Sequence, residues 1–335
     1  MAINWLNILK SLDWEVLTRT VEWLENGHQA HLFTVVKTWG SAPRLPGALL
    51  AVREDGHLIG SVSGGCIEDD LADQARNQTL PKTATVVEYG VNNNDAQRFG
   101  IPCGGRLQIV IEPLHDAAQL RPLLQGIMQR KLIKRSLSLS SGAVKLSEVL
   151  PEGLPRIDGD WFHSYFGPQW RLLIIGANQL GSVLASMAQV LDFDVLICDP
   201  REDMRAEWHV EGANWIYGMP DDAVLDINPD AHTAIVAVTH DPKLDDMALL
   251  EALKSDAFYV GALGSSKNQQ KRRERMRMFD LSEADIAKLH GPVGLPIGSR
   301  TPAEIAIAIL AELVQVRAQQ QKTGVAPATE RHCAA

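Results

Sequence analysis

The sequence predicts an α/β protein in two parts, a small α+β part followed by a part with a parallel sheet. The chain has 335 residues, of which 45% are hydrophobic, and this length suits two domains. Short apolar runs with turn signals dominate the first half, whereas apolar strands alternate with amphipathic helices in the second. We expect an α+β domain over 1–115, a connecting segment over 116–168, a parallel-sheet domain over 169–320 and a flexible tail over 321–335.

Each element of the first half has a local signal. Apolar residues at helical spacing predict a helix over 13–25, and a β-branched run predicts a strand over 30–36. Glu54-Asp55-Gly56 separates two apolar runs and indicates a hairpin. The remaining expected elements are a helix over 67–77, strands over 83–89 and 106–112, a helix over 120–132 and a hairpin around Ser141-Gly142.

The second half opens with a strand, a glycine turn, a helix and another strand. Arg171–Ile175 is apolar and runs into Gly176–Gly181, and Val195–Cys198 is the next apolar run. Adjacent parallel strands need such a helical crossover, so we predict a Rossmann-like domain. Further strands are expected over 234–238 and 258–260. The last helix is expected to begin at Thr301-Pro302 with a capping box.

Charge and cysteine content narrow the function classes. The chain has 32 Lys and Arg against 41 Asp and Glu, a net charge of -9, which argues against nucleic acid or an anionic membrane as a partner. The sequence contains neither a secretory signal nor an apolar run of the roughly 20 residues that span a bilayer, so we expect a cytoplasmic protein. Four cysteines are too few for a disulfide scaffold, and we expect them to be reduced.

Two glycine-rich turns in the second half are candidate ligand sites. Gly176 and Gly181 occupy the first and third positions of a dinucleotide turn, but Asn178 replaces the second glycine where phosphate oxygens normally lie. Asp199 ends the next strand and can accept from a ribose hydroxyl. A turn kept only for packing is the alternative. The second turn, 261–267, offers backbone N–H groups and Ser265 to an anion, whereas we interpret the basic run over 271–277 as a solvated helix face.

Three loops in the first half are more unusual. Gly40–Arg44 follows a strand, Ser63–Cys66 lies between a strand and a helix, and Cys103–Gly105 precedes a strand. Each cysteine adjoins a Gly-Gly pair, where backbone can approach a ligand closely. A helix N-terminus favours a thiolate, which the acidic residues 68–70 oppose at Cys66. Buried structural cysteines are the alternative, and the spacing does not favour zinc.

Together these segments resemble the XdhC/CoxI family. Any one of them is a weak signal, but their combination in this order is specific, and they cover nearly all of the chain except the connecting segment and the tail. The matching stretches are 38–44, 60–66, 99–105, 199–201, 239–241, 259–265, 291–298 and 300–306.

The resemblance implies a carrier rather than an enzyme. Such a chaperone binds molybdenum cofactor, as molybdopterin or its cytosine dinucleotide form, protects it and inserts it into a molybdenum hydroxylase apoenzyme of the xanthine dehydrogenase or aldehyde oxidoreductase type. The implied partners are the large subunit of that hydroxylase, a cysteine desulfurase, a molybdopterin nucleotidyltransferase and a second copy of the chain as a homodimer.

Under this interpretation the first half holds the metal end of the cofactor. Cys103 is the first candidate for a molybdenum or sulfur contact and Cys66 the second, because thiolates are soft ligands. Arg44 suits phosphate or oxo groups. The other candidate cofactor-binding residues are Ser41, Gly64, Gly65, Gly104 and Gly105 in the first half, and Gly176, Gly181, Asp199, Gly261, Gly264 and Ser265 in the second.

Two other functions remain open. An NAD(P)-dependent oxidoreductase with a small accessory domain requires a nicotinamide site and a proton-relaying His or Lys. Asn178 argues against it, and we interpret His240 as structural or ligand-lining. A pure interaction protein would leave the Gly-Gly pairs beside cysteines unexplained beyond turn geometry.

Overall fold

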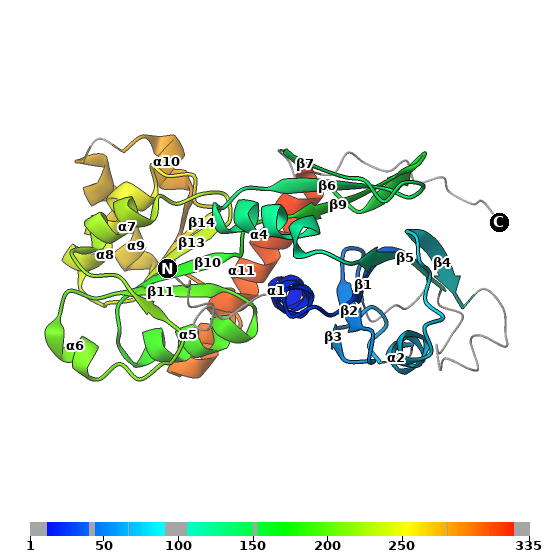
Figure 1. The fold of residues 1–335 in the computed structure, drawn as a ribbon. Helices are drawn as coiled ribbons and strands as arrows, with labels where there is room; N and C mark the ends of the chain where they lie inside the picture. The colour runs from blue at the N-terminus through cyan, green and yellow to red at the C-terminus, as the bar shows by residue number, and fades with distance from the viewer. Residues whose placement is uncertain are drawn as a thin grey trace. The chain divides into compact units, whose positions relative to one another are not determined.

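The computed structural model describes residues 12–39, 44–65, 67–90, 106–149, 153–279 and 281–324. The chain divides into two compact units whose described parts lie within residues 12–168 and 169–323. We call them the N-unit and the Rossmann unit and describe each by itself (Figure 1). Both combine helices with sheets, and the predicted α/β class is confirmed.

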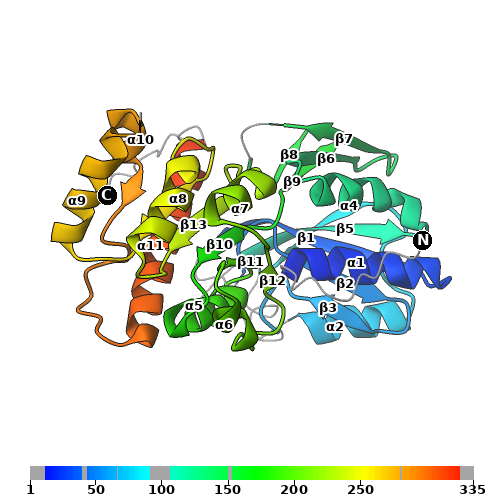
Figure 2. The same ribbon diagram turned by 90° about the vertical axis from the view of Figure 1, so that its left-hand side faces the viewer.

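The N-unit is built on a five-stranded antiparallel sheet. Its order is β3-β2-β1-β5-β4. One face packs against α2 (Glu68–Arg76), with Phe33, Ile109 and Leu71 in the shared core. The other face carries α1 (Leu12–Glu25), visible in Figure 2. The strands are β1 (Ala30–Trp39), β2 (Leu49–Arg53), β3 (Leu58–Gly60), β4 (Thr85–Tyr89) and β5 (Arg106–Leu114).

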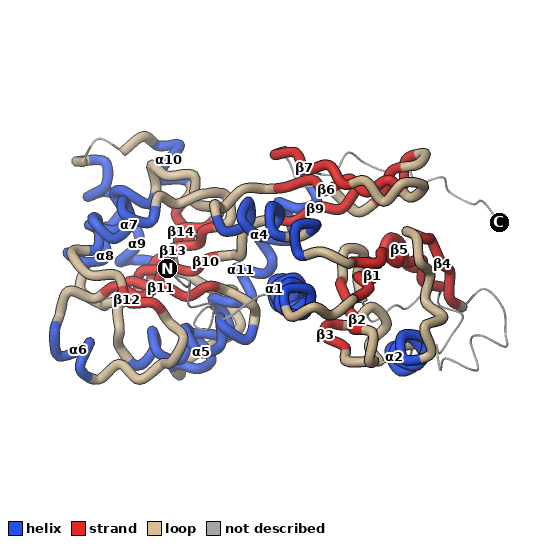
Figure 3. The backbone as a smooth tube through the Cα atoms, viewed as in Figure 1, coloured by secondary structure: helices blue, strands red, loops and turns tan. Residues whose placement is uncertain are grey.

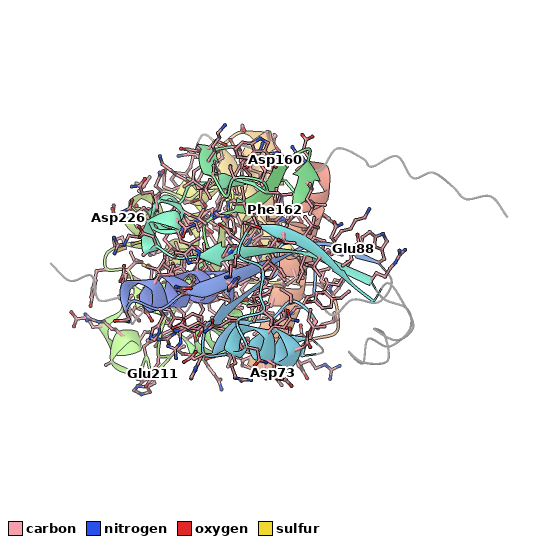
Figure 4. The ribbon with its side chains drawn as sticks, turned by 45° about the vertical axis from the view of Figure 1, so that its right-hand side comes forward. Asp73, Glu88, Asp160, Phe162, Glu211 and Asp226 are labelled. Carbon is pink, nitrogen blue, oxygen red and sulfur yellow. The ribbon has the colours of Figure 1, made fainter. Side chains whose placement is uncertain are left out.

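Residues 116–168, expected as a connecting segment, fold as part of the N-unit. They form η3 and α4 and a second antiparallel sheet of order β7-β6-β9-β8. Phe162 of β9, labelled in Figure 4, packs with Val110 of β5, and the buried Arg135 and Glu112 form two hydrogen bonds of 2.6 and 2.8 Å. The bounds are η3 (Ala117–Gln119), α4 (Arg121–Met128), β6 (Ile133–Ser138), β7 (Val144–Glu148), β8 (Arg156–Asp158) and β9 (Trp161–Phe166).

The strand register brings three loops to one end of the five-stranded sheet. Trp39 pairs with Arg106, Tyr89 pairs with Leu107, and Gly60 pairs with the second residue of β2. The segments after β1, after β3 and between β4 and β5 therefore leave from, or enter at, this same end. We call it the loop end.

The Rossmann unit has a parallel six-stranded sheet of order β12-β11-β10-β13-β14-β15, drawn in red in Figure 3. The strands are β10 (Arg171–Ile175), β11 (Asp194–Cys198), β12 (Asn214–Trp215), β13 (Thr233–Ala237), β14 (Tyr259–Ala262) and β15 (Leu289–His290). The expected Rossmann-like domain is confirmed.

Helices cover both faces of this sheet, as the two hydrophobic clusters require. Side chains of α5 (Gln179–Val190) and α11 (Pro302–Gly324) pack on one face. Side chains of α7, α8, α9 and α10 pack on the other. The remaining bounds are α6 (Glu202–Ala206), α7 (Pro220–Ile227), α8 (Pro242–Ala252), α9 (Ser266–Arg277) and α10 (Glu283–Ala287).

One boundary changes the interpretation of a candidate residue. The strand expected to end at Val260 continues to Ala262, so Gly261 lies inside β14 and not in a loop. A Cβ at Gly261 would lie 2.6 Å from Val293 and 2.7 Å from Tyr259, so this glycine is explained by packing. In the part of the chain that the structure describes, no helix is long and apolar enough to span a membrane.

Candidate functional site

The loop after β3 is built around one buried carboxylate, that of Glu68 at the start of α2. The carboxylate accepts from the Ser61 hydroxyl at 2.6 Å, from the Ser63 hydroxyl and from four backbone N–H groups. Those N–H groups belong to Val62, Ser63, Gly65 and Ile67, at 3.0 to 3.2 Å. Burial by itself raises the pKa of Glu68, but the two hydroxyls and the N–H groups outweigh it and lower the pKa to about 2.

Glu68 determines what this loop can offer a ligand. Its ionised carboxylate draws the N–H groups inward, so they do not face outward as an anion cradle. Gly64 and Gly65 have φ of +80° and +109°. A Cβ at Gly65 would meet nothing within 4 Å, so the outer side of that residue is open to close approach. From the sequence alone, Glu68 is predicted only to oppose a thiolate at Cys66. Two serines before an acidic residue in the first helical turn were the available signal.

The remaining N-unit candidates fall partly outside the described residues. Ser41, Cys66, Cys103, Gly104 and Gly105 lie outside them, so both proposed metal contacts do too. Arg44 is described and half-buried, three residues before Gly47, whose N–H donates to Val35 on β1. The described residues that flank these gaps include Trp39 and Arg106, which lie at the loop end. The structure therefore brings the flanks of the three loops to one end of the sheet.

In the Rossmann unit, the turn after β10 is shaped by backbone packing. Gly176 has φ of +119°, and a Cβ there would lie 2.9 Å from the Thr239 backbone nitrogen. A Cβ at Gly181 would lie 2.1 Å from the Gly176 carbonyl oxygen. The first and third glycines thus have the tight-turn and helix-packing roles typical of this fold.

The Asn178 side chain is held by the turn itself. Its side chain turns back to the sheet, where Nδ2 donates to the Val238 carbonyl at 2.6 Å and Oδ1 accepts from Gly181 N–H at 2.9 Å. As the N-cap of α5, Asn178 occupies one of the N–H groups that could otherwise donate to a phosphate.

Asp199 is enclosed by its own neighbours. Its side chain is 0% exposed. It accepts from Ala177 N–H at 2.9 Å and from Arg201 Nε and Nη2 at 2.8 and 2.6 Å. Burial raises the pKa of Asp199, but the Arg201 and Ala177 hydrogen bonds outweigh it and hold this pKa below its usual range. A ribose hydroxyl would have to displace Arg201 to reach this carboxylate.

The loop after β14 is tied down by a buried ion network. Arg272 of α9 donates to Asp245 at 3.0 Å, to Asp246 at 2.8 Å and to the Leu263 carbonyl at 3.1 Å. Gly264 has φ of +139°, and Ser265 caps α9 by accepting from Asn268 N–H at 3.3 Å. These contacts fix the loop internally.

The arginines of the basic run on α9 mainly form ion pairs with carboxylates of the Rossmann unit. Arg272 is buried in the ion network, so the expectation of a wholly solvated face is wrong for this residue. Arg275 pairs with Asp246 at 2.6 Å and Arg277 pairs with Glu283 at 2.6 Å. His240 lies exposed after β13 with φ of +66°.

Neither a metal cluster nor a reactive thiol is found among the described residues. Within them, no group of three or more His, Cys, Asp and Glu side chains is placed to hold a metal ion. Cys198 is buried at the end of β11, and burial with the nearby Asp199 and Asp221 raises its pKa to about 12. This thiol is therefore unreactive at neutral pH.

Comparison with known proteins places both units in one family. The model of the XdhC and CoxI family matches residues 23–90, and the XdhC Rossmann domain model matches residues 172–313.

Individual relatives extend over most of the chain. The Escherichia coli (strain K12) molybdenum cofactor insertion chaperone PaoD is 28% identical, over 93% of this chain and 91% of that protein. A Bacillus subtilis (strain 168) protein described as a probable xanthine dehydrogenase component is 26% identical, over 88% of this chain and 95% of that protein.

A solved structure supports the fold. The crystal structure of a Bacillus halodurans protein described as a xanthine dehydrogenase superposes with a TM-score of 0.73 at 24% identity, covering 91% of this chain and 98% of that one. With the matched domains and these relatives, the chain belongs to the XdhC/CoxI family.

Proposed function

We propose that this protein binds molybdenum cofactor and delivers it to a molybdenum hydroxylase of the xanthine dehydrogenase or aldehyde oxidoreductase type. The observation that carries the proposal is the similarity to the insertion chaperone PaoD, which spans 93% of this chain and 91% of that protein. A similarity of this extent includes both units, so the proposal concerns the whole chain.

The residues of the loop end fit such a ligand. Molybdenum cofactor joins a pterin, a phosphate and a molybdenum dithiolene, and when bound to its client enzyme it supplies the hydroxylation chemistry. Lys37 and Arg106 are exposed cations at this end, and Arg44 is half-buried. Guanidinium and ammonium groups suit phosphate oxygens. The open side of Gly65 permits close backbone approach, and Cys103 and Cys66 remain our candidates for the molybdenum or sulfur contact.

In our proposal the candidate residues of the Rossmann unit contact the nucleotide part of the cytosine dinucleotide form of the cofactor. Gly176, Gly181 and Asp199 line the turn after β10, and Gly264 and Ser265 belong to the loop after β14. These loops follow strands β10 and β14 at the carboxyl edge of the sheet, where such sheets bind ligands. Because Arg201 encloses Asp199, the acceptor that an NAD ribose requires is occupied, which disfavours the oxidoreductase alternative.

We further propose that the chain acts as a carrier without turnover of its own and contacts the large subunit of the hydroxylase. The other proposed partners are a cysteine desulfurase, a molybdopterin nucleotidyltransferase and a second copy of the chain.

Cofactor retention tests this function. Purified protein is incubated with cofactor released from a molybdoenzyme and desalted, and retained pterin is measured by fluorescence after oxidation, with NAD binding measured in parallel. We expect near-stoichiometric pterin and no NAD. Arg44→Gln and Cys103→Ala should each lower retention, whereas Arg121→Gln, which removes an exposed ion pair with Glu25, should not. Clear NAD binding without pterin would contradict the proposal.

A further inference from the structure

We propose that Trp39, with Lys37 and Arg106 beside it, forms a stacking platform for a planar heteroaromatic ring that carries a phosphate, as a pterin phosphate does. This inference rests on the proposed function and names the side chains of the N-unit that bind the pterin part of the ligand.

The strand register places the three side chains together. Trp39 is the last residue of β1 and pairs with Arg106, the first residue of β5. Lys37 precedes Trp39 by two residues on the same strand, so both side chains leave the sheet on one face. The Lys37 Nζ lies 5.0 Å from the indole ring centroid, and the Arg106 guanidinium carbon lies 5.2 Å from it. Both distances are within the range of cation–π contacts.

This end of the sheet is accessible. Within the described ranges, β2 pairs with β1 only from Ala30 to Thr34, so the stretch from Lys37 to Trp39 pairs with β5 and not with β2. The Trp39 indole is half-buried, and both cations are exposed. Among the described residues, no carboxylate lies within ion-pair distance of either cation.

The carboxylate nearest in the strand register is that of Glu88 on β4, labelled in Figure 4. It accepts from Gln108 Nε2 at 2.9 Å, and Gln108 is the β5 partner of Lys37. The cluster thus combines two cations with one carboxylate that already has a hydrogen-bond donor. Its local charge is positive in a chain whose net charge is -9.

These three side chains match the two chemical parts of a pterin phosphate. An indole face stacks on a planar heterocycle, and such stacking is worth about 1–3 kcal/mol per ring for nucleic-acid bases. An exposed cation–π contact is worth only about 0.5–1 kcal/mol, so a phosphate can draw either cation away from the indole at small cost. A phosphate monoester offers charged acceptors to both cations.

The N-unit contains a matched control. Trp161 of β9 is also half-buried and has Lys145 Nζ at 4.5 Å from its ring centroid. It has one such cation instead of two and belongs to the other sheet of the N-unit. If pterins bound non-specifically to any tryptophan beside a lysine, substitution of Trp161 would weaken pterin binding as substitution of Trp39 does.

The test is a binding titration with the full chain, followed by fluorescence anisotropy. The probes are the oxidised, phosphate-bearing pterin prepared from released cofactor and the same pterin after phosphatase treatment. Trp39→Ala should weaken the binding of both probes by about fivefold or more, and Trp39→Phe should restore most of the lost affinity. Lys37→Gln with Arg106→Gln should weaken the phosphorylated probe by about tenfold and the dephosphorylated one by less than about twofold. Trp161→Ala should change neither.

The outcomes separate this inference from the proposed function. If the wild-type chain binds the probes and the Trp39 and double-cation variants bind them equally well, the platform is rejected while the carrier proposal stands. If the wild-type chain retains no pterin, both are rejected. Thermal unfolding of each variant identifies a change that disrupts the fold. If Trp39→Ala disrupts the fold, the test relies on Trp39→Phe and on the double-cation variant. The platform is then rejected if both of these variants bind the probes as tightly as the wild-type chain does.

Discussion

The loop after β3 and the turn after β10 resemble each other in sequence but differ in how they are held. Each is a glycine-containing segment between a strand and a helix, and in each a carboxylate binds backbone N–H groups. Among the described residues, Glu68 accepts only from hydroxyls and backbone N–H groups, whereas Asp199 forms an ion pair with Arg201. A glycine pattern therefore marks close backbone packing and does not by itself indicate a ligand. In both segments the protein's own carboxylate occupies N–H groups that a ligand would need.

Gly181→Ala, in the turn after β10, should cause the largest loss of stability. In Gly181→Ala the new Cβ would lie 2.1 Å from a backbone oxygen, which cannot move without distorting the turn. We expect a loss of about 3–5 kcal/mol in the free energy of unfolding of the Rossmann unit, measured by urea denaturation. Ser186→Ala, at an exposed position of the same helix, is the control. A loss below about 1 kcal/mol would show that the turn relaxes freely.

Glu68→Gln should have the next largest effect. Glutamine replaces a charged acceptor by an amide whose NH₂ group faces other donors, so several buried N–H and O–H groups lose their partner. We expect a loss of about 3 kcal/mol in the free energy of unfolding of the N-unit. Asp69→Asn, at the exposed neighbouring position, should change stability little. Equal losses in the two variants would contradict the role given to Glu68.

The same carboxylate predicts a pH dependence. The pKa of Glu68 is lowered from 4.5 to about 2 on folding, so its contribution is complete above about pH 4.5 and is lost as the pH falls towards 2. The difference in unfolding free energy between wild type and Glu68→Gln should therefore be constant near neutrality and shrink between pH 4.5 and pH 2. Urea titrations at several pH values measure it, and a difference that stays constant down to pH 2 would contradict the assignment.

Asp199→Asn should destabilise its unit less than Glu68→Gln destabilises the N-unit. The asparagine oxygen can still accept from Ala177 N–H, and the released Arg201 side chain can move into solvent. We expect a loss of about 2 kcal/mol in the unfolding free energy of the Rossmann unit. Asp203→Asn, an exposed change on α6, is the control. Equal losses in the Asp199→Asn and Asp203→Asn variants would contradict the role given to the Asp199–Arg201 pair.

The smallest stability effect is expected at Gly65. Its φ of +109° is unfavourable for alanine, but a Cβ would meet nothing within 4 Å, so Gly65→Ala should cost about 1–2 kcal/mol. Gly142 has φ of +71° and the same open surroundings, so Gly142→Ala should cost a similar amount. Cofactor retention separates them, because only the Gly65 variant should lose it. Equal retention in both variants would remove Gly65 from the site.

Much of the fold could be predicted from local sequence. The strand Arg171–Ile175, the glycine turn and the following helix were predictable because apolar runs and helical spacing are local signals. The sheet over residues 133–166 was harder to predict, because its strands are short and partly polar and are stabilised by pairing partners distant in sequence.

The site was less predictable for the same reason. Glycine positions in the two turns could be read directly, but the six contacts of Glu68 depend on how the loop folds back on its helix. The hydrogen bonds from Arg201 to Asp199 depend on the direction in which the arginine side chain points, which the sequence does not specify. The approach of Lys37 and Arg106 to Trp39 requires the β1–β5 register, which joins residues 67 positions apart. No local pattern contains that information.

Transfer of molybdenum cofactor from this chain to a client enzyme can be measured directly. Protein loaded with cofactor is desalted and mixed with apo molybdenum hydroxylases of the xanthine dehydrogenase and aldehyde oxidoreductase types, and recovery of hydroxylase activity is followed against an equal amount of free cofactor. We predict faster and more complete activation of at least one client from the loaded protein. If activation of both types is no better than that given by free cofactor, the chain is not a carrier that delivers the cofactor to these enzymes.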